Sequence, residues 1–598
     1  MGSLRRLNRY YWTYRYLFIP GLCFAVISSI FALIVPTVVR RAIDAIPQFV
    51  ATYGGVQGTP VEDLVYWDLF FTLAFMALVI IGLSILSGAF SFLMRQTIVV
   101  ASRHIEFDLR NRLFDHLQKL SWDFYQSHPT GDLITRSTSD IEQVRRYIGP
   151  AVMYSTRAVV TIVTALTIMF IISPKLTWYA LIPMPFLAVS VFFVMRLVHE
   201  RSDALQAQYS VLTSRVQEAL SGIRVLKAYR REASEAEAFD AESSAYRTRS
   251  LDLALVEAAW RPVFVLLVGL SSIIVVWVGG RLVMDGTITL GNIAEYMIYV
   301  ALMTWPVASM GFVITMIQRA AASMERLAEV FDSMPSISDR DGVVDGPISG
   351  ALELRNVGFK YPDAEEWVFR DVSVSVPAGS TLAIVGRTGA GKTTLVELIP
   401  RLLDATAGQV LVDGRDVRDI PVRRLRESIG YVPQEVFLFS DTIRNNIAFG
   451  HMEANEGAVE DAAREADLLE NVADFPQGFE TFVGERGITL SGGQKQRTSI
   501  ARALIRRPDI LILDDALSAV DVNTERTILG HLRQQFGRRT IVIVSHRVSA
   551  VQDADRIIVL DEGRVAEQGT HASLLAEDGF YAALYRKQQL EAEVEAYS

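Results

Sequence analysis

Six long segments without a charged residue constrain this chain more than any other feature of its sequence. They are residues 17–39, 69–94, 158–174, 176–195, 262–280 and 296–318. A helix needs about 20 apolar residues to cross a bilayer, and each segment approaches or exceeds that length. Buried helices of a soluble protein could account for one or two such segments, but not for six. The sequence therefore predicts a lipid bilayer as partner and an all-α membrane domain of six helices.

The composition indicates that a soluble part is joined to this membrane part. Half of the 598 residues are hydrophobic and the mean hydropathy is +0.26, yet 21% of the residues are charged. The net charge of −9 argues against nucleic acid as the main partner, because such a protein needs a basic surface to neutralise phosphates. Cys23 is the one cysteine, so disulfides within the chain and cysteine-based metal sites are excluded.

Basic residues predict the orientation in the membrane. The N-terminus and the two long connections, residues 95–157 and 196–261, are rich in arginine, whereas Lys175 and Arg281 are the one basic residue of two short connections. Arginine-rich segments stay on the cytoplasmic side, so both termini are predicted to be cytoplasmic. The basic aromatic stretch at residues 5–16 is typical of a helix that lies at the membrane interface.

The two long connections carry helical patterns, so the membrane helices are predicted to continue about 30 Å into the cytoplasm. In the first connection, Pro129 and Gly131 predict a break around a short crosswise helix. A similar helix is expected near residues 212–224.

The pattern of residue types changes after the sixth apolar segment. Residues 333–350 are rich in Gly, Pro, Ser and Asp, which is typical of a linker. From residue 351 onward short apolar strands alternate with helical stretches. The predicted organisation is a transmembrane domain at 1–332, a linker at 333–350 and an α/β P-loop ATPase domain at 351–598.

A glycine-rich loop carries the first functional motif. The sequence GRTGAGKTT follows an apolar strand, opens a helix and fits G-x-x-x-x-G-K-[ST]. Its backbone N–H groups can wrap phosphates, Lys392 can reach the β and γ oxygens, and the Thr393 hydroxyl can bind Mg²⁺. The predicted nucleotide-binding residues are Gly386, Arg387, Thr388, Gly389, Ala390, Gly391, Lys392, Thr393 and Thr394.

The stretch ILILDD places two carboxylates, Asp514 and Asp515, at the end of another apolar strand. A strand of the same sheet would bring the Asp514 carboxylate to the phosphates, where it can hold the magnesium ion. An apolar strand that ends in aspartate is common, and the phosphate-binding loop is what makes it informative. The sequence thus predicts ATP and Mg²⁺ as cofactors.

At this point the chain resembles the ATP-binding cassette transporters, specifically the exporters that fuse one membrane domain to one nucleotide domain in a half-transporter. The resemblance covers nearly the whole chain, and its most specific motif is LSGGQ at residues 490–494. In that family this signature completes the ATP site of the opposite nucleotide domain. The resemblance therefore implies ATP contacts from Ser491, Gly492, Gly493 and Gln494, a second half-transporter as partner, and alternating access as the mechanism.

Other positions match the family one by one. Tyr361 resembles the aromatic residue that stacks on adenine, and Gln434 resembles the glutamine that senses magnesium and water. Residues 518–521, which end at Asp521, resemble the loop that communicates between the two sites. His546 resembles the histidine that contacts the γ-phosphate. The resemblance also implies a multi-pass protein of a bacterial inner membrane.

Asp515 departs from the family pattern. Active members have glutamate after the magnesium aspartate, where it deprotonates the attacking water. Aspartate is one methylene shorter, so its oxygens would retreat by about 1 Å from a water that must lie within about 3 Å. A displacement of that size can cost on the order of 100-fold in rate. The departure favours a heterodimer in which this chain carries a hydrolysis-impaired site; a homodimeric exporter or lipid flippase with Asp515 as catalytic base is the alternative.

The cargo follows from the family, as a hydrophobic or amphipathic small molecule or lipid. Met297, Met303, Met310, Met316 and Trp305 of the sixth segment suit an adaptable apolar surface, although ordinary packing explains such residues more often. Charged residues at the segment edges can face a wet cavity or, more commonly, extend to the interface. These residues are Arg157, Glu257, Arg261 and Glu295.

Other function classes stay open at this point. A membrane-anchored ATP-binding regulator would use the same fold without moving a cargo. A membrane-tethered P-loop kinase would not require LSGGQ. Uptake rather than export occurs in a few fused relatives of the family.

Overall fold

The computed structural model describes the chain except residues 1, 341, 363, 534–537 and 598. The chain forms two compact units. One unit is helical and comprises Met1–Gln118 and Thr130–Ser333, and the other comprises Lys119–Pro129 and Met334–Ser598. The short segment Lys119–Pro129 therefore belongs structurally to the second unit, although the sequence places it between two membrane helices.

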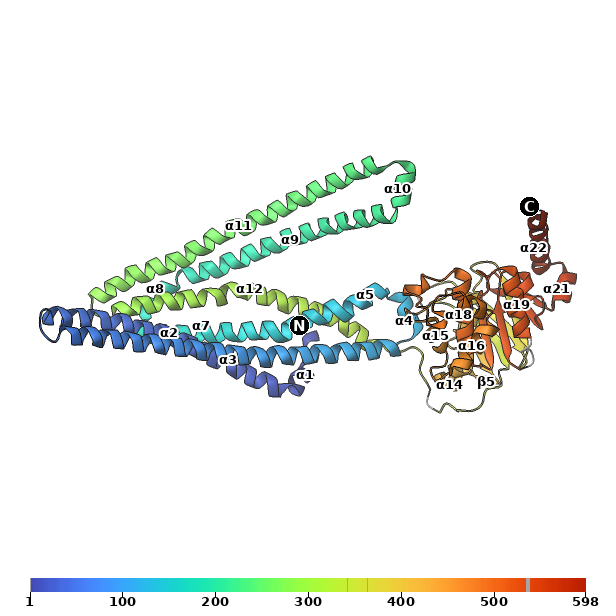
Figure 1. The fold of residues 1–598 in the computed structure, drawn as a ribbon, viewed down its shortest axis with the longest axis horizontal. Helices are drawn as coiled ribbons and strands as arrows, with labels where there is room; N and C mark the ends of the chain where they lie inside the picture. The colour runs from blue at the N-terminus through green and yellow to red at the C-terminus, as the bar shows by residue number, and fades with distance from the viewer. Residues whose placement is uncertain (1, 341, 363, 534–537, 598) are drawn as a thin grey trace. The chain divides into compact units, whose positions relative to one another are not determined.

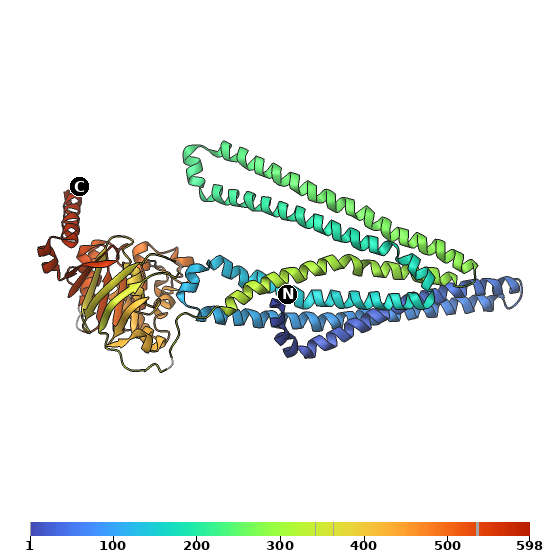
Figure 2. The same cartoon turned by 180° about the vertical axis from the view of Figure 1, so that it is seen from behind.

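Within its described residues, the helical unit contains six helices that are long and apolar enough to cross a membrane, as the sequence predicts. Figures 1 and 2 show them as long, roughly aligned rods, with α9 and α11 forming a separate arm. The helices of the unit are α1 (Asn8–Thr13), α2 (Arg15–Val56), α3 (Glu62–Lys119), α5 (Thr130–Thr135), α6 (Ile141–Arg146), α7 (Val152–Ile172), α8 (Pro174–Leu181), α9 (Pro183–Ser221), α10 (Ile223–Tyr229), α11 (Glu232–Met284) and α12 (Leu290–Asp332).

Three expected boundaries differ in the structure. Pro174 begins α8 rather than ending the third span, because proline fits the first turn of a helix and the Ser173 hydroxyl caps it by accepting from the Leu176 N–H (3.3 Å). Gly131 lies inside α5, so the break around α4 (Trp122–Ser127) falls at His128 and Pro129. The second crosswise helix is α10, which starts after Gly222 and not at residue 212.

Glu295 also differs from its expected place at a span edge. It lies near the start of α12, fully buried, with Arg40 Nη1 of α2 at 3.4 Å from its carboxylate. The Thr37 hydroxyl donates to the same carboxylate (2.8 Å). A buried charge is tolerated only when it is paired and hydrogen-bonded, which is the case here. These contacts join α2 to α12.

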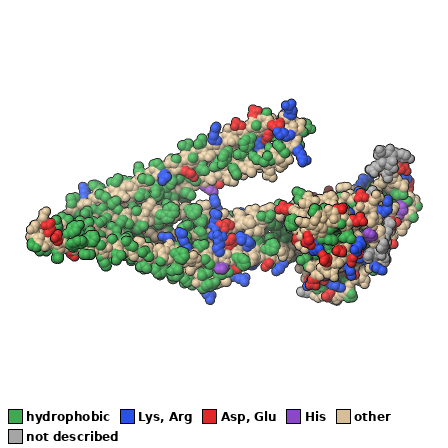
Figure 3. All heavy atoms as spheres, in the orientation of Figure 1, with side chains coloured by type: hydrophobic (Ala, Val, Ile, Leu, Met, Phe, Trp, Pro, Cys, Tyr) green, Lys and Arg blue, Asp and Glu red, His purple; other side chains and the backbone are tan. Residues whose placement is uncertain are grey.

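The surface of the helical unit is consistent with a membrane environment. Figure 3 shows hydrophobic side chains over much of its visible face, with charged side chains gathered near α10, at the end of the α9–α11 arm. Exposed apolar residues such as Phe75, Leu78, Ile81 and Ile85 follow one another along α3. A surface of this kind is stable in lipid rather than in water.

The second unit contains two sheets. The six-stranded sheet has the order β10-β9-β3-β8-β7-β6, with parallel pairs except β9–β10, and the four-stranded sheet is antiparallel with the order β2-β1-β4-β5. The strands are β1 (Leu352–Phe359), β2 (Phe369–Val376), β3 (Thr381–Gly386), β4 (Ala407–Val412), β5 (Arg415–Asp416), β6 (Ile429–Val432), β7 (Ile510–Asp514), β8 (Thr540–Val544), β9 (Arg556–Asp561) and β10 (Arg564–Gly569).

One face of the six-stranded sheet packs against helices, and the other packs against the antiparallel sheet together with α13 (Lys392–Glu397) and α14 (Val422–Glu427), so the six-stranded sheet is buried on both faces. Along β7, Leu511 and Leu513 pack into one core cluster, and Ile510 and Ile512 pack into the other. A strand buried on both faces needs an unbroken apolar run, which explains ILIL. The helices are α13 (Lys392–Glu397), α14 (Val422–Glu427), α15 (Ile443–Ala448), α16 (Glu456–Glu465), α17 (Leu469–Ala473), α18 (Gly492–Leu504), α19 (Val522–Arg533), α20 (Val548–Val551), α21 (His571–Glu577) and α22 (Phe580–Tyr597).

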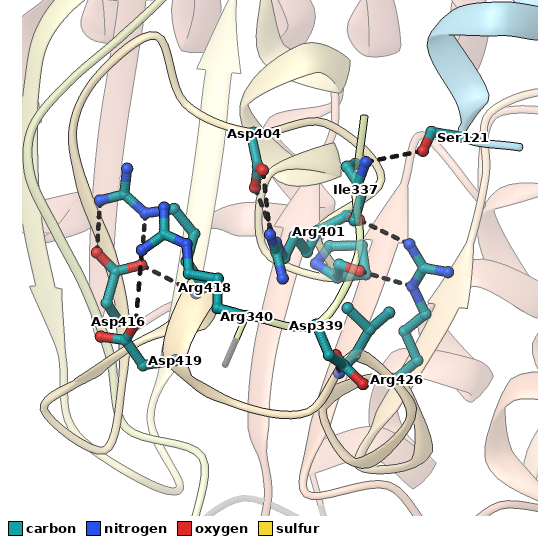
Figure 4. Close-up of polar contacts among 12 residues, drawn as sticks. Ser121, Ile337, Asp339, Arg340, Arg401, Asp404, Asp416, Arg418, Asp419 and Arg426 are labelled. Atoms are coloured by element: carbon teal, nitrogen blue, oxygen red, sulfur yellow. Dashed lines mark hydrogen bonds and ion pairs between the residues drawn. The ribbon is translucent and has the colours of Figure 1, made fainter. Parts of the chain in front are cut away.

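The segment expected to be a linker has no regular structure but follows the second unit closely (Figure 4). The Ile337 N–H donates to the Ser121 hydroxyl (2.9 Å), next to α4. The Asp339 carboxylate accepts from the Val422 N–H (2.7 Å) at the start of α14, and Arg340 pairs with Asp419 (3.5 Å). The chain is thus attached at several points before β1 begins.

Two glycines have the same backbone torsion, but we expect their replacement by alanine to destabilise the protein to different extents. Gly408 and Gly414 both have φ +75°. A Cβ at Gly408 would lie 2.3 Å from the Asn356 carbonyl oxygen, whereas a Cβ at Gly414 meets nothing within 4 Å. We expect Gly408→Ala to destabilise the protein by about 3 kcal/mol or more, and Gly414→Ala by about 1 kcal/mol, from left-handed strain alone. Thermal unfolding of the purified protein measures both, and equal shifts would contradict the steric account.

Candidate nucleotide site

The site lies where four parallel strands of the six-stranded sheet end. The carboxyl ends of β3, β8, β7 and β6 share one edge, because parallel strands run in the same direction. A cavity of about 380 Å³ opens at this edge. Its lining residues are Tyr361, Val368, Thr388, Gly389, Gly391, Lys392, Thr393, Thr394, Gln434, Asp514, Asp515, Val544 and His546. The structure therefore brings together residues that are separated by up to 185 positions in the chain.

The phosphate-binding loop connects β3 to α13, as the sequence predicts. Gly391 takes φ +88° at the position that caps α13, and a Cβ there would lie 2.7 Å from the Val368 side chain. Glycine is therefore required for the loop to curl in front of the helix. The first N–H groups of a helix have no partner within it, so the start of α13, directly after this loop, favours an anion.

The Lys392 side chain folds back onto the phosphate-binding loop. Its ammonium donates to the carbonyl oxygens of Gly386 (3.0 Å) and Arg387 (2.8 Å), and the residue is 7% exposed. Burial lowers the pKa of Lys392, while the negative charges of Asp515 and Asp514 oppose this change. A desolvated cation held against its own loop is well placed to exchange these carbonyls for phosphate oxygens.

Asp514 fits a magnesium ligand. The residue ends β7 with no exposed surface, and neither of its carboxylate oxygens has a hydrogen-bond partner. Burial raises the pKa of Asp514, and the Asp515 charge adds to the rise, whereas the Thr393 hydroxyl and the Lys392 charge oppose it. An orphaned buried carboxylate is costly unless a cation meets it. Thr393 lines the same cavity, so hard oxygen ligands from two elements are available to a divalent ion beside phosphates.

Asp515 lies in the same lining, one residue beyond the strand. Its φ of 47° is left-handed, a conformation that aspartate tolerates better than most side chains. Its N–H donates to the Val544 carbonyl (2.9 Å), which fixes the backbone against β8. The carboxylate therefore approaches the cavity from a fixed backbone, and side-chain length decides how far it reaches.

Three other predicted residues line the cavity from separate elements. Tyr361 follows β1 and its hydroxyl lies 3.3 Å from the Thr394 hydroxyl of α13. Gln434 follows β6, and His546 follows β8. An aromatic ring, an amide and an imidazole thus surround the phosphate-binding loop.

The remaining predicted residues lie elsewhere. Ser491 caps α18, accepting from the Gln494 N–H (3.3 Å), while the Gln494 side chain accepts from the Ser491 N–H (2.9 Å). Asp521 accepts from the N–H groups of Asn523 (3.1 Å) and Thr524 (3.0 Å) at the start of α19. Neither the LSGGQ motif nor Asp521 belongs to the lining of the cavity.

Several residues around the site escaped the sequence analysis. Glu397, at the end of α13, has its pKa raised to about 7, first by burial and then by the Asp514 charge. Gln496 of α18 holds the 518–521 loop by donating to the Ser518 hydroxyl (3.0 Å) and accepting from the Ala519 N–H (2.9 Å). No local pattern marks these residues, because their partners are distant in the sequence.

The helical unit contains a second cavity, of about 300 Å³, between α2, α7 and α12. Arg157 lines it, as does Trp305, whereas none of the four methionines of the sixth segment does. No ion pair of Arg157 occurs within the described residues. Ser29, which is nearly fully buried, also lines this cavity, and its hydroxyl has no hydrogen-bond partner.

The raised pKa of Glu397 predicts a pH-dependent stability in the absence of nucleotide and Mg²⁺. Since the folded pKa of about 7 exceeds the ordinary value of 4.5, the contribution of Glu397 to stability is greatest below pH 4.5 and is lost as the pH rises to about 7. Glu397→Gln should therefore raise the free energy of unfolding by on the order of 1 kcal/mol at pH 8, after allowance for solvent screening, and by much less at pH 5.

Thermal unfolding at both pH values measures this difference. The exposed Glu577 provides a matched control, and Glu577→Gln should change stability equally little at both. A gain for Glu397→Gln that is the same at pH 5 and pH 8 would contradict the prediction.

Comparison with protein families supports the two-part organisation. Residues 17–307 match the family described as ABC transporter transmembrane region, and residues 369–518 match the family described as ABC transporter. The predicted fold class, a six-helix membrane domain followed by a nucleotide-binding domain, is confirmed.

Individual relatives extend this match over most of the chain. A probable multidrug resistance ABC transporter of Bacillus subtilis is 38% identical over 81% of this chain and 83% of its own length. An ATP-dependent lipid A-core flippase of Syntrophus aciditrophicus is 35% identical over 86% of both chains. The structure of a bacterial Atm1-family ABC exporter with ATP bound matches with a TM-score of 0.75 and 27% identity, covering 96% of this chain and 99% of that one. The chain therefore belongs to the ATP-binding cassette transporters, as a dimer-forming membrane exporter that fuses a transmembrane domain to a domain coupling ATP hydrolysis to transport.

Proposed function

We propose that this chain is one half of a heterodimeric ABC exporter for hydrophobic or amphipathic compounds, and that its own ATP site hydrolyses slowly. Asp515 carries the proposal. It stands on a fixed backbone in the lining of the nucleotide cavity, and we assign it the role of the base. A carboxylate one methylene short of glutamate reaches about 1 Å less far toward a water.

ATP binding itself is unaffected by this change. Lys392 and the N–H groups of α13 would hold the phosphates, Tyr361 would face the adenine, and His546 would contact the γ-phosphate. Asp514 and Thr393, with Gln434 nearby, would hold Mg²⁺. When bound, Mg²⁺ offsets negative charge on the phosphate oxygens. Gln434 is the residue that would report the filled site to the membrane domain.

Two features support a second chain as partner. Ser491 and Gly492 of the signature are exposed and lie outside the cavity of their own chain, so they are free to serve a partner's site. Helix α10 has no buried residue and exposes Val225 (61%) and Tyr229 (76%). An apolar helix left uncovered in this way suits contact with another subunit. A partner that supplies glutamate would give one fast and one slow site.

The cavity between α2, α7 and α12 supports an amphipathic cargo. Its wall is largely apolar, and the Arg157 guanidinium adds one positive charge. A partly buried guanidinium with no carboxylate partner among the described residues favours a ligand that brings its own acceptor or negative charge. ATP bound between two chains would close the nucleotide domains, the crosswise helices would transmit the closure, and the cavity would open outward. Hydrolysis would then reset the transporter.

The proposed topology places both termini and the nucleotide domain in the cytoplasm of a bacterial cell, with six crossings of the inner membrane. The arginine-rich connections support this orientation. The proposed limits are 1–332 for the transmembrane domain, 333–350 for the linker and 351–598 for the nucleotide-binding domain. The structural units change at residue 333, close to the first of these limits.

A homodimeric exporter or lipid flippase that uses Asp515 as its base is the alternative. Similarity to a protein named as a lipid A-core flippase favours it. The two assemblies differ in whether the chain turns over ATP without another subunit.

Lengthening the base tests the slow-site proposal. Asp515→Glu should raise the ATP hydrolysis rate of the assembled transporter at this chain's site, by on the order of 10- to 100-fold, because the carboxylate regains about 1 Å of reach. Asp515→Asn, which cannot accept a proton, should not raise it. Single-turnover hydrolysis of radiolabelled ATP measures the rate, and unfolding temperatures check that the left-handed backbone tolerates glutamate.

Purification of the chain alone separates the two assemblies. The heterodimer predicts little ATPase activity and co-purification of a second half-transporter from the native membrane. Vigorous turnover by the isolated chain, abolished by Asp515→Ala, would overturn the heterodimer and support the homodimer.

Arg157 provides a test of cargo selection. Arg157→Gln should weaken transport of anionic amphiphiles by about tenfold in reconstituted vesicles and leave neutral hydrophobic compounds within about twofold, since one charge-assisted bond is lost. Arg261→Gln is the matched control, because Arg261 is exposed and lies outside the cavity. Equal losses for anionic and neutral cargo would contradict a charge-selecting role.

A further inference from the structure

We infer that Gln588 of the C-terminal helix α22 is a positioning residue for the loop that carries His546, so that α22 helps to set the geometry of the ATP site. The inference deepens the proposed function, since it rests on the role of His546 at the γ-phosphate. It concerns a residue that lies 42 positions from the histidine and outside every sequence motif.

The side-chain amide of Gln588 spans the histidine loop with both of its ends. Its Nε2 donates to the His546 carbonyl oxygen (2.6 Å), and its Oε1 accepts from the Val548 N–H (2.8 Å). Val548 is the first residue of α20, whose N–H has no partner within the helix. The amide thus hydrogen-bonds both the His546 carbonyl oxygen, just beyond β8, and the first N–H of α20. It holds these two backbone groups at a fixed separation.

Helix α22 is itself anchored, so it can act as a support. The Glu567 carboxylate of β10 accepts from the N–H groups of Phe580 and Tyr581, at the start of the helix. Tyr581 is fully buried in the core, and its hydroxyl lies 2.7 Å from His571 Nδ1. Gln588 follows Tyr581 by seven residues, which is about two helical turns, so the buried ring and the amide lie on one face.

The same helix contacts the phosphate-binding loop. The Arg387 guanidinium lies over the Phe580 ring, 5.7 Å from its centre, and pairs with Asp561 at 3.7 Å. The first turn of α22 therefore touches the phosphate-binding loop, and Gln588, about two turns further along, touches the loop that carries His546. A helix that contacts both loops can keep their separation constant while the site is empty or filled.

The histidine loop is also held from its opposite side. Arg547 donates to the carbonyl oxygens of Ser518 (3.1 Å) and Val520 (3.2 Å) and pairs with the buried Glu525 (2.6 Å). The loop thus stands between the 518–521 segment and α22. Without Gln588, the Arg547 contacts would still fix the side of the loop that faces the 518–521 segment, but no other hydrogen bond among the described residues would hold the His546 carbonyl oxygen.

Replacing Gln588 tests this role through the ratio of kcat in the variant to kcat in the unchanged chain. Gln588→Ala should lower kcat for ATP by about tenfold and change KM by less than about twofold, because a misplaced catalytic group slows the chemistry while the phosphate-binding loop is intact. Gln588→Glu, which can accept from Val548 but cannot donate to His546 O, should lower kcat as well. Gln589→Ala is the matched control, since the Gln589 amide is exposed and donates to Tyr585 of its own helix (2.6 Å), and kcat should stay unchanged.

A double-mutant cycle with His546→Ala decides whether the effect passes through the histidine. In the His546→Ala chain, Gln588→Ala should have no further effect on single-turnover hydrolysis or on the release rate of a bound fluorescent ATP analogue. Release is measurable even where turnover is lost. Multiplicative losses in the cycle, a raised KM with unchanged kcat, or an equal loss for Gln589→Ala would each overturn the inference.

A second variant and a second genetic background make the result interpretable. If Gln588→Ala lowers the unfolding temperature markedly, the milder Gln588→Glu carries the test. The ratios are measured in the assembled transporter, first with the full-length wild-type chain and again with Asp515→Glu. A failure of the slow-site proposal appears in the wild-type rate itself, whereas a failure of the Gln588 inference appears in the ratio.

Discussion

The parallel pairing of β3, β8, β7 and β6 is the constraint on which the nucleotide site depends. Each of these strands is an apolar run buried on both faces, so none can slip by a residue without placing its end in the core. Parallel direction then brings the phosphate-binding loop, His546, Asp514 and Gln434 to one edge. The same rigidity explains why a single methylene at Asp515 matters, because the backbone beneath it cannot move to compensate.

In the helical unit, α12 has the corresponding role through polar contacts. Tyr296 and Tyr299 are fully buried, and their hydroxyls donate to carbonyl oxygens of Met169 (2.5 Å) and Leu33 (3.0 Å) in neighbouring helices. Glu295 meets Arg40 and Thr37 of α2. Lipid tails are as apolar as leucine side chains, so such contacts and close packing, rather than water exclusion, hold membrane helices together. The cavity with Arg157 lies between α12 and the same two helices, which means that its walls are defined by these bonds.

The sequence predicted much of this arrangement, and the differences have physical reasons. Length and hydropathy were sufficient for the six spans, and the glycine-rich loop was sufficient for the nucleotide site. Glu295 was expected at an interface because its partner Arg40 is 255 residues away and no local pattern links them. The crosswise helix was expected too early, since residues 212–221 are good helix formers and only Gly222 ends α9. Gln588 and Glu397 were missed because their significance arises from neighbours that only folding provides.

The sequence by itself determined the chemistry that this chain can perform: six apolar spans require a bilayer, and GRTGAGKTT followed by an aspartate-ended strand requires a nucleotide. These features are local, since they depend on residue type and spacing along the chain. Only the tertiary structure decided which side chains share a cavity, that LSGGQ and Asp521 lie outside it, and that the C-terminal helix reaches the histidine loop. Contacts of this kind join residues that are distant in sequence, and they are fixed by strand order and packing rather than by any local pattern.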